Sequence, residues 1–105
     1  MPNFNISTKD PELCRDKLEL RTEIDILDYQ VIKLLNHRSK YIDRAAKLKR
    51  IENLPARTHD RVALVMAKVR SSAEQEGLDQ ELVARIWHEL VEWSIAREEE
   101  HLSHS

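Results

Sequence analysis

Two positively charged residues, Arg38 and Lys49, occupy positions where the surrounding sequence pattern calls for apolar side chains. Arg38 lies a heptad beyond Val31, and Lys49 lies four residues after Ala45, on the stripe that these apolar residues define. On one helix, the two cations point within about 20° of each other and lie roughly 16 Å apart along the axis. A buried cation without a counter-charge is costly, so an anion must meet this pair.

The anion could come from the protein or from a ligand. Acidic side chains of other helices could meet the two cations, or the long side chains could extend outward to solvent. The alternative is an anionic ligand held inside a helical bundle, and this hypothesis directs the search for further polar residues on inward faces.

A hydroxyl and a carboxyl continue the apolar stripe of the last predicted helix. Ser94 and Glu98 follow Trp87 and Val91 at three- or four-residue spacing, so both side chains are expected to point inward. The alternative is that the helix becomes solvent-exposed near its end, where residues 97–100 form a charged and mostly acidic run.

Two more arginines lie beside apolar stripes. Arg61 borders the stripe of the second predicted helix, where a solvated flank is an equal alternative. Arg21 lies about 25 Å from Arg38 along the first helix, so the two cannot share a pocket within one chain. Arg21 could instead complete the pocket of a second chain in an antiparallel dimer, or form a surface salt bridge with Asp25.

Other chemistries find little support. The five histidines have no cysteine or paired carboxylate at metal-ligand spacing. The sequence also contains no Ser-His-Asp arrangement, glycine-rich phosphate loop or nucleophile elbow. We therefore expect no metal, no cofactor and no covalent catalysis.

The composition indicates one almost purely helical domain. The chain has 105 residues, 41% of them hydrophobic, with one glycine and three prolines. A net charge of −2 gives no electrostatic basis for nucleic acid binding. The lone Cys14 fits a reducing compartment, and neither a signal peptide nor a run long enough to span a membrane is recognisable. We expect a soluble cytoplasmic protein that does not bind membranes.

The expected fold is all-α, with three helices of unequal length. Because no glycine or proline lies between Pro11 and Pro55, residues 12–54 are predicted to form one uninterrupted helix, with Asp10 as its cap. Thr58 is expected to cap a second helix from His59 to about Glu76. The resulting domain spans residues 11–102, preceded by a flexible arm over residues 1–10.

Gly77 and Asp79 are predicted to end the second helix and to cap the third. Leu78 is expected to make the hydrophobic contact that accompanies the glycine cap. The tail from about Glu100 is expected to be disordered apart from Leu102. The apolar residues that the third helix is expected to bury are Val83, Ile86, Trp87, Leu90, Val91 and Ile95.

The length of the first helix predicts an oligomer. Residues 12–54 would extend about 65 Å, whereas a compact chain of this size has a diameter of only about 33 Å. Roughly half of the helix, with its apolar stripe, would project from a monomer and expose a large hydrophobic patch. A two-fold dimer, in which the long helices pack along each other, would cover that patch.

The order of these motifs resembles the all-helical (type II) chorismate mutases, a family whose relatives include isochorismate-pyruvate lyases. The resemblance covers about residues 13–100, and each motif is weak alone, but their joint order and spacing are specific. The segments that carry it are LELRTEIDILD with Arg21, LLNHRSKYI with Arg38, AAKLKR with Lys49, LPARTHDR with Arg61, Leu78-Asp79, and VEWSIAREE with Ser94 and Glu98.

The resemblance implies an intertwined homodimer with two active sites and a chorismate mutase activity in aromatic amino acid biosynthesis. Arg21 of the mate and Arg38 would clamp the two carboxylates of chorismate, and Arg61 would line the same side. Lys49 would donate to a carboxylate and to the ether oxygen, which Glu98 would reach from the other side. The catalytic residues would be Arg38, Lys49 and Glu98, and the substrate-binding set would add Arg21, Thr58, Arg61, Val62 and Ser94.

Three positions depart from the family pattern. Many relatives have glutamine in place of Glu98, and an ionised carboxylate cannot donate to the ether oxygen, so Glu98 would have to be protonated. Val62 and Thr58 stand where relatives often carry a glutamate and an aspartate that help to hold the substrate hydroxyl.

The last two departures leave the substrate open. Formation of salicylate by an isochorismate-pyruvate lyase is the second interpretation, and a mutase acting on an amino-chorismate is the third. A non-enzymatic dimerisation module with a basic groove is a further alternative, although it does not explain inward polar groups on three helices.

Overall fold

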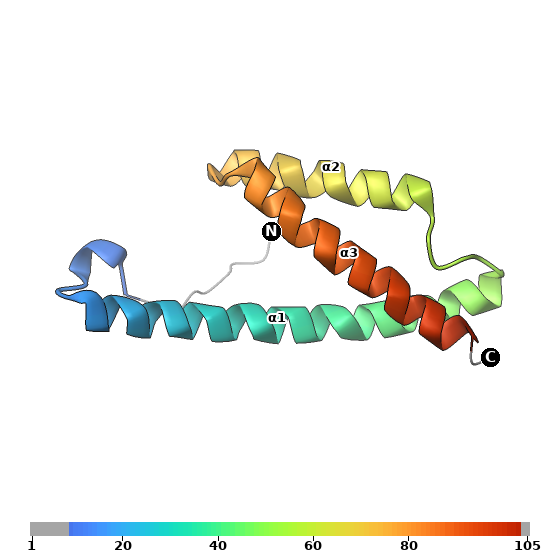
Figure 1. Ribbon diagram of the computed structural model, residues 1–105, viewed down its shortest axis with the longest axis horizontal. Coiled ribbons are helices and arrows are strands. Elements are labelled where there is room, and N and C mark those ends of the chain that lie inside the picture. Colours follow the sequence, from blue (N-terminus) through green and yellow to red (C-terminus); the bar gives the residue numbers. More distant parts are fainter. Residues whose placement is uncertain (1–8, 104–105) are drawn as a thin grey trace. The chain divides into compact units, whose positions relative to one another are not determined.

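The structure is a computed structural model that describes residues 9–103. It contains a short 3-10 helix, η1 (Pro11–Leu13), and three α-helices, α1 (Lys17–Glu52), α2 (His59–Glu76) and α3 (Gln80–Ser103), with no strand among the described residues (Figure 1). The prediction of three helices of unequal length is therefore confirmed. The chain divides into two units, one ending at Arg38 and the other beginning at Ser39, and α1 contributes to both.

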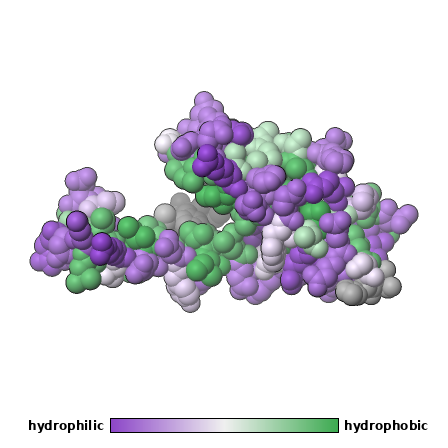
Figure 2. All heavy atoms as spheres, in the orientation of Figure 1, coloured by the Kyte–Doolittle hydropathy of each residue, from purple (hydrophilic) through white to green (hydrophobic). Residues whose placement is uncertain are grey.

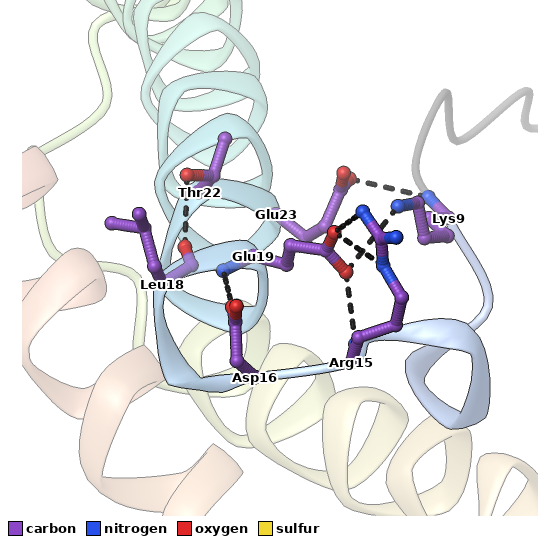
Figure 3. Close-up of polar contacts among 7 residues, drawn as sticks. All are labelled: Lys9, Arg15, Asp16, Leu18, Glu19, Thr22 and Glu23. Carbon is purple, nitrogen blue, oxygen red and sulfur yellow. Dashed lines mark hydrogen bonds and ion pairs between the residues drawn. The ribbon is translucent and has the colours of Figure 1, made fainter.

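The long helix starts later than predicted, at Lys17 rather than Glu12. Asp10 caps only η1, and Cys14 is extended. Asp16 then accepts a hydrogen bond from the Glu19 backbone N–H at 2.9 Å, while the Glu19 carboxylate accepts one from the Arg15 backbone N–H at 2.8 Å (Figure 3). Asp16 thus caps the first turn of α1, and the Glu19 carboxylate holds the residue that precedes this cap.

Further polar contacts hold the chain before α1 against the first turns of the helix. The Arg15 guanidinium donates to Glu19 Oε1, and the Lys9 backbone N–H donates to Glu23 at 3.2 Å (Figure 3). The hydrogen bonds from Arg15 hold the pKa of the Glu19 carboxyl below its ordinary value. Lys9 and Asp10 belonged to the expected flexible arm, the rest of which lies outside the described residues.

The apolar stripe in the first unit is exposed in the single chain, as the predicted length of the helix implied. Figure 2 shows apolar side chains interspersed with hydrophilic ones on the surface of this helix. The exposed stripe residues are Leu20, Ile24, Leu27, Val31 and Leu34.

The ends of α1 and α2 share one capping geometry. Asn53 follows α1 at φ 58° and Gly77 follows α2 at φ 71°. After each residue the chain turns back, so that Leu54 N–H donates to the Lys49 carbonyl and Leu78 N–H donates to the Ala73 carbonyl, both at 2.8 Å. The predicted helix end at Gly77 is confirmed, but Leu78 is largely exposed.

The core of the second unit lies where α2 packs against α3. Ala56, Val91 and Ile95 form a buried apolar cluster, and partly buried Val62, Val65, Met66 and Leu102 pack against it. Asp79 accepts a hydrogen bond from the Glu81 N–H at 2.9 Å, which confirms its capping of α3.

Two predictions about α3 are wrong for the chain as described. Ile86 is exposed, although Val83, Val91 and Ile95 are buried as predicted. The helix also continues through residues 100–103 instead of becoming disordered. Ordering of this last part follows from Leu102 packing on the core and from Arg50 Nη2, which donates to the His101 carbonyl at 2.5 Å. Among the described helices, none has the length and apolar character needed to cross a membrane.

Replacement of Gly77 by alanine should destabilise the chain. The left-handed backbone at Gly77 disfavours any side chain, although an added Cβ would meet no atom within 4 Å. We therefore expect the free energy of unfolding to fall by about 1–2 kcal/mol, because the cost is conformational strain alone. Urea unfolding measures it, with Gly77→Asn as a milder variant and the exposed Ser72→Ala as a control; equal stability of Gly77→Ala and wild type would contradict the assignment.

Candidate functional site

A lysine and a glutamate from different helices face each other in the interior of the second unit. Lys49 Nζ of α1 lies 2.7 Å from Glu98 Oε1 of α3, and the two side chains are 19% and 6% exposed. The contact has the distance of an ion pair but not the angles of a hydrogen bond, so Oε1 is a buried acceptor with no hydrogen-bond donor among residues 9–103. Glu98 is thus not part of a solvent-exposed helix end, and its inward orientation is confirmed.

The end of α1 brings a backbone carbonyl to Lys49. The Lys49 carbonyl takes part in the cap at Asn53, after which the chain turns and buries Ala56. Lys49 Nζ donates to the Ala56 carbonyl at 2.5 Å. Arg57 anchors the same loop by donating to both oxygens of Glu92 on α3, at 3.1 and 2.6 Å. The Lys49 ammonium therefore contacts both the loop after α1 and α3.

Ser94 lies one turn before Glu98 on the inward face of α3, as predicted. It is 4% exposed, and its hydroxyl donates to the Leu90 carbonyl at 2.7 Å. Val91 and Ile95 are buried on the same helix. Ser94 and Glu98 therefore lie on the same buried side of α3 as these apolar core residues.

Three predicted site residues of the loop and α2 have different surroundings. Thr58 stands at the N-cap position of α2, but its side chain makes no capping hydrogen bond. Val62 is partly buried and packs against the apolar cluster. Arg61 is exposed on α2. An apolar side chain thus occupies the position next to Arg61.

The remaining two arginines belong to the first unit. Arg38 is partly buried on α1, and Arg21 is exposed on the same helix. Lys49 and Glu98 belong to the second unit, so the expected approach of Arg21 and Arg38 to them stays a prediction.

A second group of charged residues, also on α1 and α3, was not anticipated. Arg97 donates through Nε and Nη2 to both oxygens of Asp43, the second bond measuring 3.1 Å. His101 Nε2 lies 3.3 Å from Asp43, and the Arg97 guanidinium lies 5.5 Å from the Trp93 ring. The hydrogen bond from Arg97 holds the pKa of the Asp43 carboxyl below its ordinary value and raises that of Arg97.

The arrangement at Lys49 suits recognition of an anion that carries a hydrogen-bond acceptor. An ammonium has three protons, so Lys49 keeps donors beyond the one that it gives to the Ala56 carbonyl. Glu98 can accept a hydrogen bond when ionised and can donate one when protonated. Within residues 9–103, no group of three or more His, Cys, Asp or Glu side chains is placed to hold a metal ion.

Comparison with known proteins identifies close similarities. Residues 20–99 match the family described as chorismate mutase type II. An isochorismate pyruvate lyase of Pseudomonas aeruginosa is 31% identical over 91 residues, which are 86% of this chain and 88% of that protein. A bifunctional chorismate mutase/prephenate dehydratase of Aquifex aeolicus is 34% identical over 76 residues, which are 70% of this chain but only 21% of that protein.

The Asp43–Arg97 pair should make the fold sensitive to acid. Because the folded chain lowers the pKa of Asp43 below its ordinary 3.8, the stabilisation is complete above that value and is lost as pH falls through the lower folded pKa. We expect Asp43→Asn to lower the free energy of unfolding at pH 7 and to reduce its loss between about pH 5 and pH 2. Urea unfolding at several pH values measures both; an acid dependence identical to wild type would refute the role of Asp43.

Proposed function

Because the chain belongs to the chorismate mutase type II family, we propose that it is an isomerase that converts chorismate to prephenate. The observation that carries this proposal is the buried meeting of Lys49 and Glu98 from two helices. A cation and a carboxyl group placed together suit a substrate that brings negative charge and reacts at an ether oxygen.

The reaction requires little chemistry from the protein. In this Claisen rearrangement the ether C–O bond breaks while a C–C bond forms between the enolpyruvyl arm and the ring, within one molecule. The protein must hold the arm over the ring and stabilise negative charge that gathers on the ether oxygen. Lys49 supplies that charge stabilisation, because its ammonium is fixed by the Ala56 carbonyl and keeps a donor for the substrate.

Glu98 changes its role between the free and the substrate-bound protein in this proposal. In the free chain its carboxylate compensates Lys49 at 2.7 Å. A bound dicarboxylate supplies negative charge to Lys49 and disfavours a second ionised carboxyl nearby. Protonated Glu98 then donates to the ether oxygen from the side opposite Lys49.

The other predicted residues complete the proposed site. Arg38 and Arg21 of a second chain clamp the two substrate carboxylates, because planar guanidinium groups bind carboxylates through two parallel hydrogen bonds. Arg61 lines the carboxylate side. Thr58, Val62 and Ser94 surround the ring.

A homodimer is part of the proposal. In the single chain, α1 leaves many large apolar side chains exposed, among them Leu20, Ile24 and Val31. Soluble proteins rarely leave a continuous apolar stripe in water, and a second copy of α1 would cover it. The same association would supply Arg21 in trans.

Isochorismate-pyruvate lyase activity is the second candidate. The lyase breaks the same ether bond but transfers a ring hydrogen to the methylene carbon of the arm, which yields salicylate and pyruvate. The observation that favours it is Val62, which packs against the apolar cluster and cannot bind a ring hydroxyl. The lyase of P. aeruginosa also aligns with 88% of its length.

The decisive experiment identifies products. The purified protein is incubated separately with chorismate and isochorismate at about pH 5 and pH 7.5, and the mixtures are assayed for prephenate, salicylate and pyruvate. Prephenate from chorismate supports the mutase. Salicylate with pyruvate and little prephenate would assign the lyase, and no conversion of either substrate would refute both candidates.

Glu98→Gln should flatten the pH profile of the mutase. An ionised carboxylate cannot donate to the ether oxygen, so we expect wild-type kcat to fall as pH rises. The glutamine amide donates at every pH. Steady-state rates between pH 5 and 8 test this, with the exposed neighbour Glu99→Gln as control; a Glu98→Gln profile that parallels wild type would contradict the role of Glu98.

Mixing two inactive variants should restore activity if Arg21 acts in trans. A heterodimer of Arg21→Ala and Lys49→Ala chains contains one site with both residues intact. After unfolding and refolding an equal mixture, activity should reach about a quarter of wild type, because half of the dimers are mixed and each has one intact site. An Arg21 that acts within its own chain would give no recovery.

A further inference from the structure

The Asp43–Arg97 contact lies on the two helices that carry the pair facing the proposed substrate. On α1, Asp43 precedes Lys49 on the segment that belongs to the second unit. On α3, Arg97 is the neighbour of Glu98. The two hydrogen bonds from Arg97 to Asp43 therefore connect the same two helices as the Lys49–Glu98 contact.

A second contact connects the last turns of the two helices. Arg50, the residue after Lys49, donates to the His101 carbonyl at 2.5 Å. His101 in turn lies 3.3 Å from Asp43. Ala46, which lies between Asp43 and Arg50 on α1, is 1% exposed, and its methyl group carries no polar atom that could bind α3.

The Lys49–Glu98 contact does not by itself fix the relative orientation of the two side chains. Its distance is that of an ion pair, but Glu98 Oε1 receives no hydrogen bond from a described residue. A Coulomb attraction depends on distance and only weakly on angle, whereas two parallel hydrogen bonds from a guanidinium to a carboxylate fix both. The orientation of Glu98 toward Lys49 must therefore come from neighbouring contacts.

We propose that Asp43 and Arg97 are positioning residues, which hold α3 on α1 so that Glu98 stays opposite Lys49 and the two side chains can reach the ether oxygen from its two sides. This inference rests on the proposed function for its catalytic consequence. A displacement of about 1 Å of a reacting group can lower a rate about 100-fold, so a contact one residue from Glu98 can control kcat without touching substrate.

Two features stabilise the Asp43–Arg97 contact. The Trp93 ring lies 5.5 Å from the Arg97 guanidinium and restrains it by a cation–π contact. The lowered pKa of Asp43 keeps its carboxylate ionised at neutral and mildly acidic pH. The Asp43–Arg97 contact thus persists over the pH range in which the enzyme would be assayed.

An ordinary surface ion pair is the competing interpretation. The side chains of Arg97 and Asp43 are 38% and 35% exposed, and exposed pairs of this kind contribute little to stability. The Arg70–Glu81 pair is a control with a similar arginine, because it also joins two helices, measures 3.0 Å, and has an arginine side chain that is 40% exposed, although Glu81 is 74% exposed. It connects α2 with α3 and contacts neither Lys49 nor Glu98.

The test compares Asp43→Ala, Arg97→Lys and the double variant with Arg70→Gln. We expect the first two to lower kcat about tenfold or more with KM changed less than about threefold. The double variant should be no slower than the worse single variant, because the two residues act as a unit. Arg70→Gln should keep the wild-type kcat. Asp43→Ala or Arg97→Lys with a wild-type kcat would overturn the inference.

A second measurement does not depend on activity. Urea unfolding of Asp43→Ala, Glu98→Gln and their combination should give non-additive changes in the free energy of unfolding, because the Asp43–Arg97 contact sets the environment of Glu98. The combination of Arg70→Gln with Glu98→Gln should be additive. If wild type converts neither chorismate nor isochorismate, the proposed function fails. Separately, additive changes for Asp43→Ala and Glu98→Gln would overturn the positioning of Glu98.

Discussion

A buried ammonium and a buried carboxyl group must compensate each other, and the second unit of the chain is arranged around this requirement. Neither Lys49 nor Glu98 could be withdrawn from water alone without a large desolvation cost. The cap at the end of α1 brings the Ala56 carbonyl to Lys49, and the buried face of α3 brings Glu98 to the same point. The apolar cluster of α2 and α3 supplies the stabilisation that keeps these polar groups inside.

Under the proposed function, this compensation would also explain how one site can be stable when empty and receptive when a substrate arrives. Glu98 occupies the position next to Lys49 that a substrate carboxylate or ether oxygen would take in the proposed reaction. Binding then exchanges one anionic partner for another instead of creating an unpaired charge. A rearrangement within one molecule needs orientation and charge stabilisation, and both depend on how firmly α1 and α3 are held together.

The parts of this arrangement differ in how far the sequence predicts them. Lys49 and Glu98 were identified because each interrupts an apolar stripe, and α2 was bounded because Gly77 and Asp79 carry local capping signals. The late start of α1 had a readable signal as well, since Asp16 and Glu19 have the spacing of a capping box. The order of residues 100–103 was missed because it depends on Leu102 and on Arg50 from another helix. The Asp43–Arg97 contact had no local signal, because its partners are distant in sequence and meet only where the helices cross.

The rate of Lys49→Met tests most directly whether the buried ammonium performs the chemistry. The exposed Lys47→Met on the same helix is the matched control, and unfolding curves establish that both variants are folded. We predict that Lys49→Met lowers kcat for chorismate about 100- to 1000-fold, as for loss of one donor to a developing oxyanion, while Lys47→Met keeps the wild-type rate. A folded Lys49→Met variant that converts chorismate as fast as wild type would contradict the account.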